Sequence, residues 1–154
     1  MGFEFSLMGV IFLIMLFVPN IIWTKNKPKD YEKYSNKENQ KLQILERIGQ
    51  VLVVCFSVFS FNFNLWPFNL VILIIAIILM VLYELYWIKY FKSNKTMADM
   101  YSSFLAIPFA GATLPVLSFL LLGIYQNNVF LIASSIILGI GHIGIHVNHG
   151  KNFA

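Results

Sequence analysis

Charged residues and cysteines are scarce in this chain. Of its 154 residues, 12% are charged, and Cys55 is the single cysteine. One cysteine excludes a disulfide framework and a CxxC metal motif. The sequence also contains no Gly-rich phosphate loop, no Ser-His-Asp order with a nucleophile elbow and no arginine-rich voltage-sensor helix. These absences set aside the corresponding classes of protein.

Apolar residues dominate instead. The sequence is 58% hydrophobic and 16% aromatic, whereas soluble domains are roughly 45–50% apolar and about 25% charged. A bilayer can cover so much apolar surface, because about 20 mainly apolar residues cross its core of roughly 30 Å as a helix. The composition therefore predicts an all-α integral membrane bundle, with residues 1–154 forming a single transmembrane domain.

The basic residues are concentrated in two short segments. Seven of the eleven lie between Lys25 and Arg47, and three more are Lys89, Lys92 and Lys95. Basic residues in short loops between apolar runs are typical of cytoplasmic loops. This placement explains the sequence pI of about 9.2, so we expect no nucleic-acid partner.

The uncharged runs between these segments predict five transmembrane helices. We expect spans at about 5–24, 44–62, 68–88, 102–123 and 129–148, with cytoplasmic loops at 25–43 and 89–100. An uncharged turn at 61–69, FNFNLWPFN, separates the second and third spans. All eleven basic residues then lie on one side, with the N-terminus outside and the C-terminus cytoplasmic.

Specific residues predict where the second helix begins and where the third span ends. The second helix is expected to begin near Asn39. Tyr83, Tyr86, Trp87 and Tyr90 are expected to form an aromatic belt at the inner interface, where the third span ends.

The fourth predicted span contains IPFAGATLP, in which Pro108 and Pro115 bracket three small residues. Each proline removes the usual hydrogen-bond donor of the carbonyl four residues earlier, at Phe104 and Gly111. Two interpretations follow. The span is either a kinked helix that packs closely through its small residues, or a broken helix that lines a solute cavity.

The fifth predicted span ends in a series of histidines, SSIILGIGHIGIHVNHG. Ser135, Gly139, His142, His146 and His149 recur at spacings of 4, 3, 4 and 3, which predicts one helical face. Histidines four residues apart can hold one metal ion, so these three are candidate ligands of a divalent metal ion. Because no HExxH glutamate accompanies them, hydrogen bonding to neighbouring helices or lipid head groups is the alternative.

Other polar residues fall in the predicted cytoplasmic half of the bundle. An acid within a membrane span is costly and suggests a functional site. We expect a pocket there, formed with the histidines, whose candidate ligand-binding residues are Asn20, Glu46, Arg47, Gln50 and Glu84.

Several segments of the chain resemble a family of small, uncharacterised bacterial multi-pass membrane proteins. They are PNIIWTKNKPKDY, ENQKLQILERIGQ, YELYWIKYFKS, PFAGATLPV and GHIGIHVNH. The resemblance covers nearly the whole chain and implies a five-span protein of the bacterial plasma membrane. It implies no activity and no site residues.

These features favour a protein that binds or transports a small solute or metal ion through the polar pocket. Two alternatives stay open. The first is an accessory, immunity or regulatory subunit that docks its helices against a membrane-protein partner or a second copy of the chain. The second is a membrane-embedded enzyme that uses the histidines and acids. In each case the lipid bilayer surrounds the protein.

Overall fold

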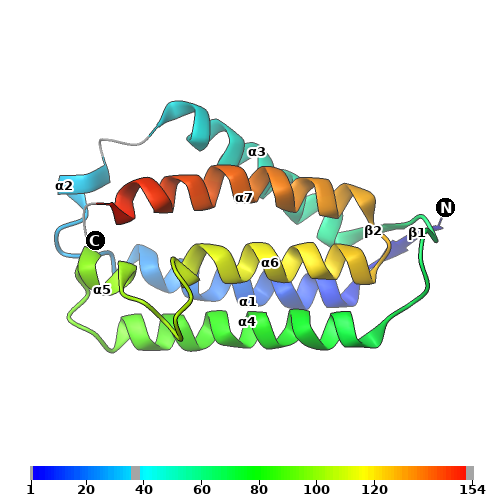
Figure 1. Ribbon diagram of the computed structural model, residues 1–154, viewed down its shortest axis with the longest axis horizontal. Helices are drawn as coiled ribbons and strands as arrows, with labels where there is room; N and C mark the ends of the chain where they lie inside the picture. The colour runs from blue at the N-terminus through cyan, green and yellow to red at the C-terminus, as the bar shows by residue number, and fades with distance from the viewer. Residues whose placement is uncertain (1, 36–38, 152–154) are drawn as a thin grey trace.

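The computed structural model describes residues 2–35 and 39–151 (Figure 1). These residues form seven helices, namely α1 (Leu7–Thr24), α2 (Glu32–Ser35), α3 (Gln40–Val58), α4 (Leu70–Phe91), α5 (Met97–Tyr101), α6 (Ala110–Tyr125) and α7 (Val129–Gly150). Two short strands, β1 (Gly2–Phe5) and β2 (Phe59–Asn62), complete the fold. The prediction of a mainly helical protein is confirmed.

Three of the described helices are long and apolar enough to cross a membrane: α1, α4 and α7. Helix α6 is apolar, but its 16 residues reach only about 24 Å. Helix α3 has 19 residues and includes Lys41, Glu46 and Arg47. By length and hydropathy, the described residues thus give three candidate spans where the sequence predicted five.

Helices α1, α4, α6 and α7 run side by side, whereas α3 lies along α7 and diverges from the rest of the bundle toward its N-terminal end (Figure 1). It begins at Gln40 with Asn39 as its N-cap, where a helix start was predicted. Glycines set the α3–α7 contact. The backbone of Leu138 lies against Gly49, and the backbone of Glu46 lies against Gly141. A side chain at either glycine would push the helices apart.

A two-stranded ribbon closes one end of the bundle, so the purely α-helical prediction was wrong in this respect. Strand β1 pairs antiparallel with β2, which places Phe3 opposite Phe61 and Phe5 opposite Phe59. Both strands alternate aromatic and small or polar residues, which is the period of a strand. Four residues on each side are too few for that period to stand out from the apolar runs around them.

The predicted fourth span, 102–123, is not helical over its first eight residues, because α6 begins only at Ala110. Three residues of the preceding segment have φ between 51° and 60°: Leu105, Ala106 and Phe109. Pro108 disfavours helical backbone at Ile107 and therefore lies before the helix. Of the two prolines placed in this span, only Pro115 is inside α6.

The end of the bundle opposite the ribbon, called here the loop end, holds α2, α5 and the two lysine-rich loops (Figure 1). The loops bind one another: the amide of Lys29 donates to the carbonyl of Lys95 at 3.0 Å, and the amide of Met97 donates to Asp30 Oδ1 at 2.8 Å. In α5, the backbone amide and hydroxyl of Thr96 donate to Asp99, and these bonds hold the pKa of its carboxyl below the usual range.

Candidate functional site

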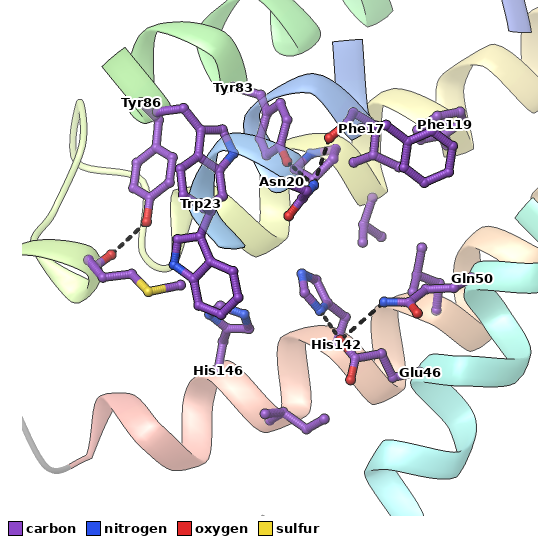
Figure 2. Close-up of a pocket in the computed structure, with 18 of the residues that line it drawn as sticks. Phe17, Asn20, Trp23, Glu46, Gln50, Tyr83, Tyr86, Phe119, His142 and His146 are labelled. Atoms are coloured by element: carbon purple, nitrogen blue, oxygen red, sulfur yellow. Dashed lines mark hydrogen bonds and ion pairs between the residues drawn. The ribbon is translucent and has the colours of Figure 1, made fainter. Parts of the chain in front are cut away.

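A cavity of about 460 Å³ lies at the loop end of the bundle, lined by residues of α1, α3, α4, α5, α6 and α7 (Figure 2). Its volume is within the range of about 300–1,000 Å³ that is usual for small-molecule sites. Figure 2 shows a polar wall, formed by Glu46, Gln50, His142 and His146, facing Trp23, Asn20 and the tyrosines of α4. The cavity therefore brings together residues that the sequence placed on separate helices.

The histidines of α7 line this cavity together with Leu138 and Ile145. These residues recur at helical spacing and form one face of α7. Ser135 and Gly139 were predicted to share this face, but they line a separate open groove on the outside of α7. The predicted stripe therefore divides between two surfaces, because α3 and α6 pack on different sides of it.

The polar wall is centred on a contact between the carboxylate of Glu46 on α3 and the imidazole of His142 on α7. Oε1 of Glu46 contacts Nδ1 of His142 and also accepts a longer bond of 3.5 Å from Gln50 Nε2 (Figure 2). The side chains of His142 and Glu46 are 24% and 20% exposed. Since both bonds reach Oε1, Oε2 of Glu46 has no hydrogen-bond partner among the described residues.

The other two histidines extend the polar wall toward α5. The ring centroids of His142 and His146 are 4.6 Å apart, and the ring of Tyr101 lies 5.4 Å from that of His146. The hydroxyl of Tyr101 is 3.2 Å from Nδ1 of His149. The histidines thus have neighbours on α3 and α5 as well as on their own helix.

The predicted metal site does not form among the described residues. They contain no group of three His, Cys, Asp or Glu side chains that could hold a metal ion. His142 pairs with Glu46, and His149 binds Tyr101. The geometry at His142, His146 and His149 therefore favours the alternative, hydrogen bonding between neighbouring helices.

The opposite wall contains a second pair of polar residues. Asn20 Nδ2 donates to the hydroxyl of Tyr83 at 2.9 Å and to the carbonyl of Leu16 at 2.6 Å. This bond joins α1 to α4 at the edge of the cavity, because both Asn20 and Tyr83 line it.

A double-mutant cycle tests the Asn20–Tyr83 bond. We expect Asn20→Leu and Tyr83→Phe to be coupled by about 0.6 kcal/mol, the average for interhelical hydrogen bonds inside membranes. The free energy of unfolding is measured in detergent for the two single variants and the double variant. Strictly additive losses would contradict the bond.

The aromatic residues near the end of α4 were predicted to form a belt at the lipid interface, and this prediction was wrong. Tyr83, Tyr86, Trp87 and Tyr90 are at most 4% exposed, and the first three line the cavity. Their spacing of three and four residues places them on one face. That spacing predicts a shared face, and the packing of neighbouring helices turns this face inward.

Two predicted site residues lie outside the cavity. Arg47 is exposed on α3, and Glu84 on α4 does not line the cavity. Oε1 of Glu84 is buried and has no hydrogen-bond partner among the described residues. The site therefore contains Asn20, Glu46 and Gln50 from the predicted ligand-binding set, without Arg47 and Glu84.

Tyr101 also lines the cavity, and no clear signal in the sequence marks it. Tyr101 ends α5, directly before the segment where a continuous helix was predicted. It contacts His146 and His149 from α5 at the loop end.

Comparison of the chain with models of protein families, curated proteins and solved structures finds no match. The resemblance to a bacterial five-span family stays a prediction.

Proposed function

We propose that this protein binds or transports a small solute in the cavity at the loop end. The cavity carries this proposal, because it combines a volume of about 460 Å³ with a mostly apolar lining and a few polar groups. Small-molecule sites usually have this composition, in which apolar side chains supply contact area and polar groups orient the ligand.

We further propose that the chain crosses a bacterial plasma membrane five times. The two lysine-rich loops lie at the same end of the bundle, and α1 begins at the other end (Figure 1). By the positive-inside rule, the loop end is cytoplasmic and the N-terminus is outside. Helix α7 ends at the loop end, which makes the C-terminus cytoplasmic and places the cavity in the cytoplasmic half.

Helices α3 and α6 supply the two additional crossings in this topology. The 19 residues of α3 reach about 28 Å, close to the thickness of the hydrocarbon core. The irregular segment 102–109 precedes the shorter α6. Irregular backbone is tolerated at membrane depth where protein or a cavity surrounds it, and α6 lines the cavity through Gly111 and Pro115.

Filling the cavity tests the proposal. Val54 of α3 lines the cavity, and we expect Val54→Phe to weaken binding of the neutral probe tert-butylbenzene by about tenfold, or about 1.4 kcal/mol. Isothermal titration calorimetry on protein in detergent micelles gives the affinity.

The matched control is Val51→Phe on the same helix. Val51 is 62% exposed and does not line the cavity, so this variant should bind the probe like the wild type. Equal heats for the wild type and both variants would show partition into the micelle only, and would refute the proposal.

The groove on the outside of α7 supports a second candidate function, docking of another membrane helix. It is open and largely apolar, and Gly139 and Gly144 contribute small surfaces to it. Small residues let another helix approach the backbone closely. An accessory subunit would use this groove, whereas a solute carrier would use the cavity.

A further inference from the structure

We infer that the ligand of the cavity is a small organic cation, whose positive charge is balanced by Glu46 and whose apolar groups pack on aromatic rings. This inference rests on the proposed function and names the class of its ligand.

The charge of the residues that line the cavity favours a cationic ligand. Among the described residues that line the cavity, Glu46 is the single acid, and none is lysine or arginine. An anionic ligand would find no permanent positive charge there. A cationic ligand would find the carboxylate of Glu46, whose side chain is 20% exposed. Its attraction is stronger there than in bulk water, because the effective dielectric constant is lower.

The geometry of the Glu46 carboxylate also favours a cationic ligand. His142 and Gln50 both bind Oε1 of Glu46, which fixes the side chain against α7. Oε2 has no hydrogen-bond partner among the described residues. The carboxylate is thus held in place and keeps one oxygen for a ligand.

The aromatic residues that line the cavity favour a cation as well. Eight of the lining residues are Phe, Tyr or Trp, and the faces of such rings attract ammonium groups within about 6 Å. Two of these rings already have an ammonium group as a neighbour, since Nζ of Lys27 lies 5.6 Å from the ring centroids of both Trp23 and Tyr31. Lys27 itself does not line the cavity.

The lysines at the loop end oppose entry of a cation, but their effect is weaker. Lys25, Lys27, Lys29, Lys89 and Lys92 are exposed. Salt screens exposed charges over a Debye length of about 8 Å, and Asp30, Glu32 and Asp99 share this end of the bundle. Glu46, which lines the cavity and whose side chain is 20% exposed, decides the preference inside it.

Two isosteric probes test the inference. Phenyltrimethylammonium and tert-butylbenzene differ in one atom, a positively charged nitrogen in place of a neutral carbon. We expect the wild type to bind the cation about tenfold more tightly or better, the size of a favourable cation–π and carboxylate contribution. The Val54→Phe variant serves as the blank for partition into micelles, and this comparison needs no other substitution.

Three variants assign the preference to the charge of Glu46. Glu46→Gln should reduce the ratio of the two affinities from about tenfold to about threefold or less, a loss of about 0.7 kcal/mol or more, because it removes the negative charge. His142→Phe removes the partner but leaves the carboxylate, so the preference should persist. Glu32→Gln makes the same change in net charge at an exposed acid of the loop end and should keep the preference.

Equal affinity of the wild type for the two probes, with both weakened by Val54→Phe, would overturn the cation inference and leave the proposed function standing. If Val54→Phe changes neither affinity, the proposed function fails with it. A loss of preference in His142→Phe equal to that in Glu46→Gln would make the contact between Glu46 and His142 a structural one between helices and would also overturn the inference.

Discussion

Replacing Gly141 with alanine should separate α3 from α7 and cost about 1–3 kcal/mol of stability, as overpacking of a tight contact does. A Cβ at Gly141 would overlap the backbone nitrogen of Glu46 and lie 2.8 Å from the carbonyl oxygen of Leu42. Backbone atoms cannot rotate away from such a contact, so the helices themselves must move. The pairing of Glu46 with His142 should weaken as a result.

Thermal unfolding in detergent measures this effect, and Gly144→Ala is the matched control. A Cβ at Gly144 would meet only side-chain carbons of Leu42, the nearest at 3.1 Å. That side chain can change its rotamer, so the control should cost less than about 1 kcal/mol. Equal losses for the two variants would contradict the close backbone approach at Gly141.

Replacing Asn128 with alanine should cost about 2–3 kcal/mol, because it removes two hydrogen bonds from a fully buried side chain. Oδ1 of Asn128 accepts from the amide of Leu131 at the start of α7, and Nδ2 donates to the carbonyl of Phe56 near the end of α3. Without them, the buried amide of Leu131 and the partly buried carbonyl of Phe56 lose their partners. The residue therefore joins two helices and caps one of them.

Asn69→Ala is the matched control, because it removes a helix cap from an exposed position. Asn69 caps α4 through its bond to the amide of Val71, but it is exposed, so water can replace the bond. We expect a loss of about 1 kcal/mol or less for this variant. Equilibrium unfolding of the two variants in the same detergent gives the comparison, and a similar loss at Asn69 and Asn128 would refute the role of the buried contact.

The candidate spans at α1, α4 and α7 could be predicted because each comes from a long run with few or no charges. For α7, the predicted span 129–148 differs from the helix by two residues at its end. Segment 102–109 could not be predicted in the same way. Its left-handed residues are not glycines, so neither hydropathy nor turn composition marks them.

The site was predictable only as a set of residues near one end of the bundle. Glu46 and His142 were both expected in the inner half, but 96 positions separate them, and their pairing depends on where Gly141 meets the backbone of α3. The orientation of the tyrosines of α4 could not be predicted for a related reason. Aromatic residues near a helix end suit the lipid interface and the protein interior equally well, and only the packing of neighbouring helices distinguishes the two.

The unequal packing of α3 bears on how a solute could enter and leave. This helix lies backbone to backbone against α7, and it meets α1 in the same way where Ser57 lies against Gly9. Toward the loop end it diverges from the rest of the bundle (Figure 1). We therefore expect a solute to reach the cavity between α1 and α3 at the loop end, past Glu46 and His142.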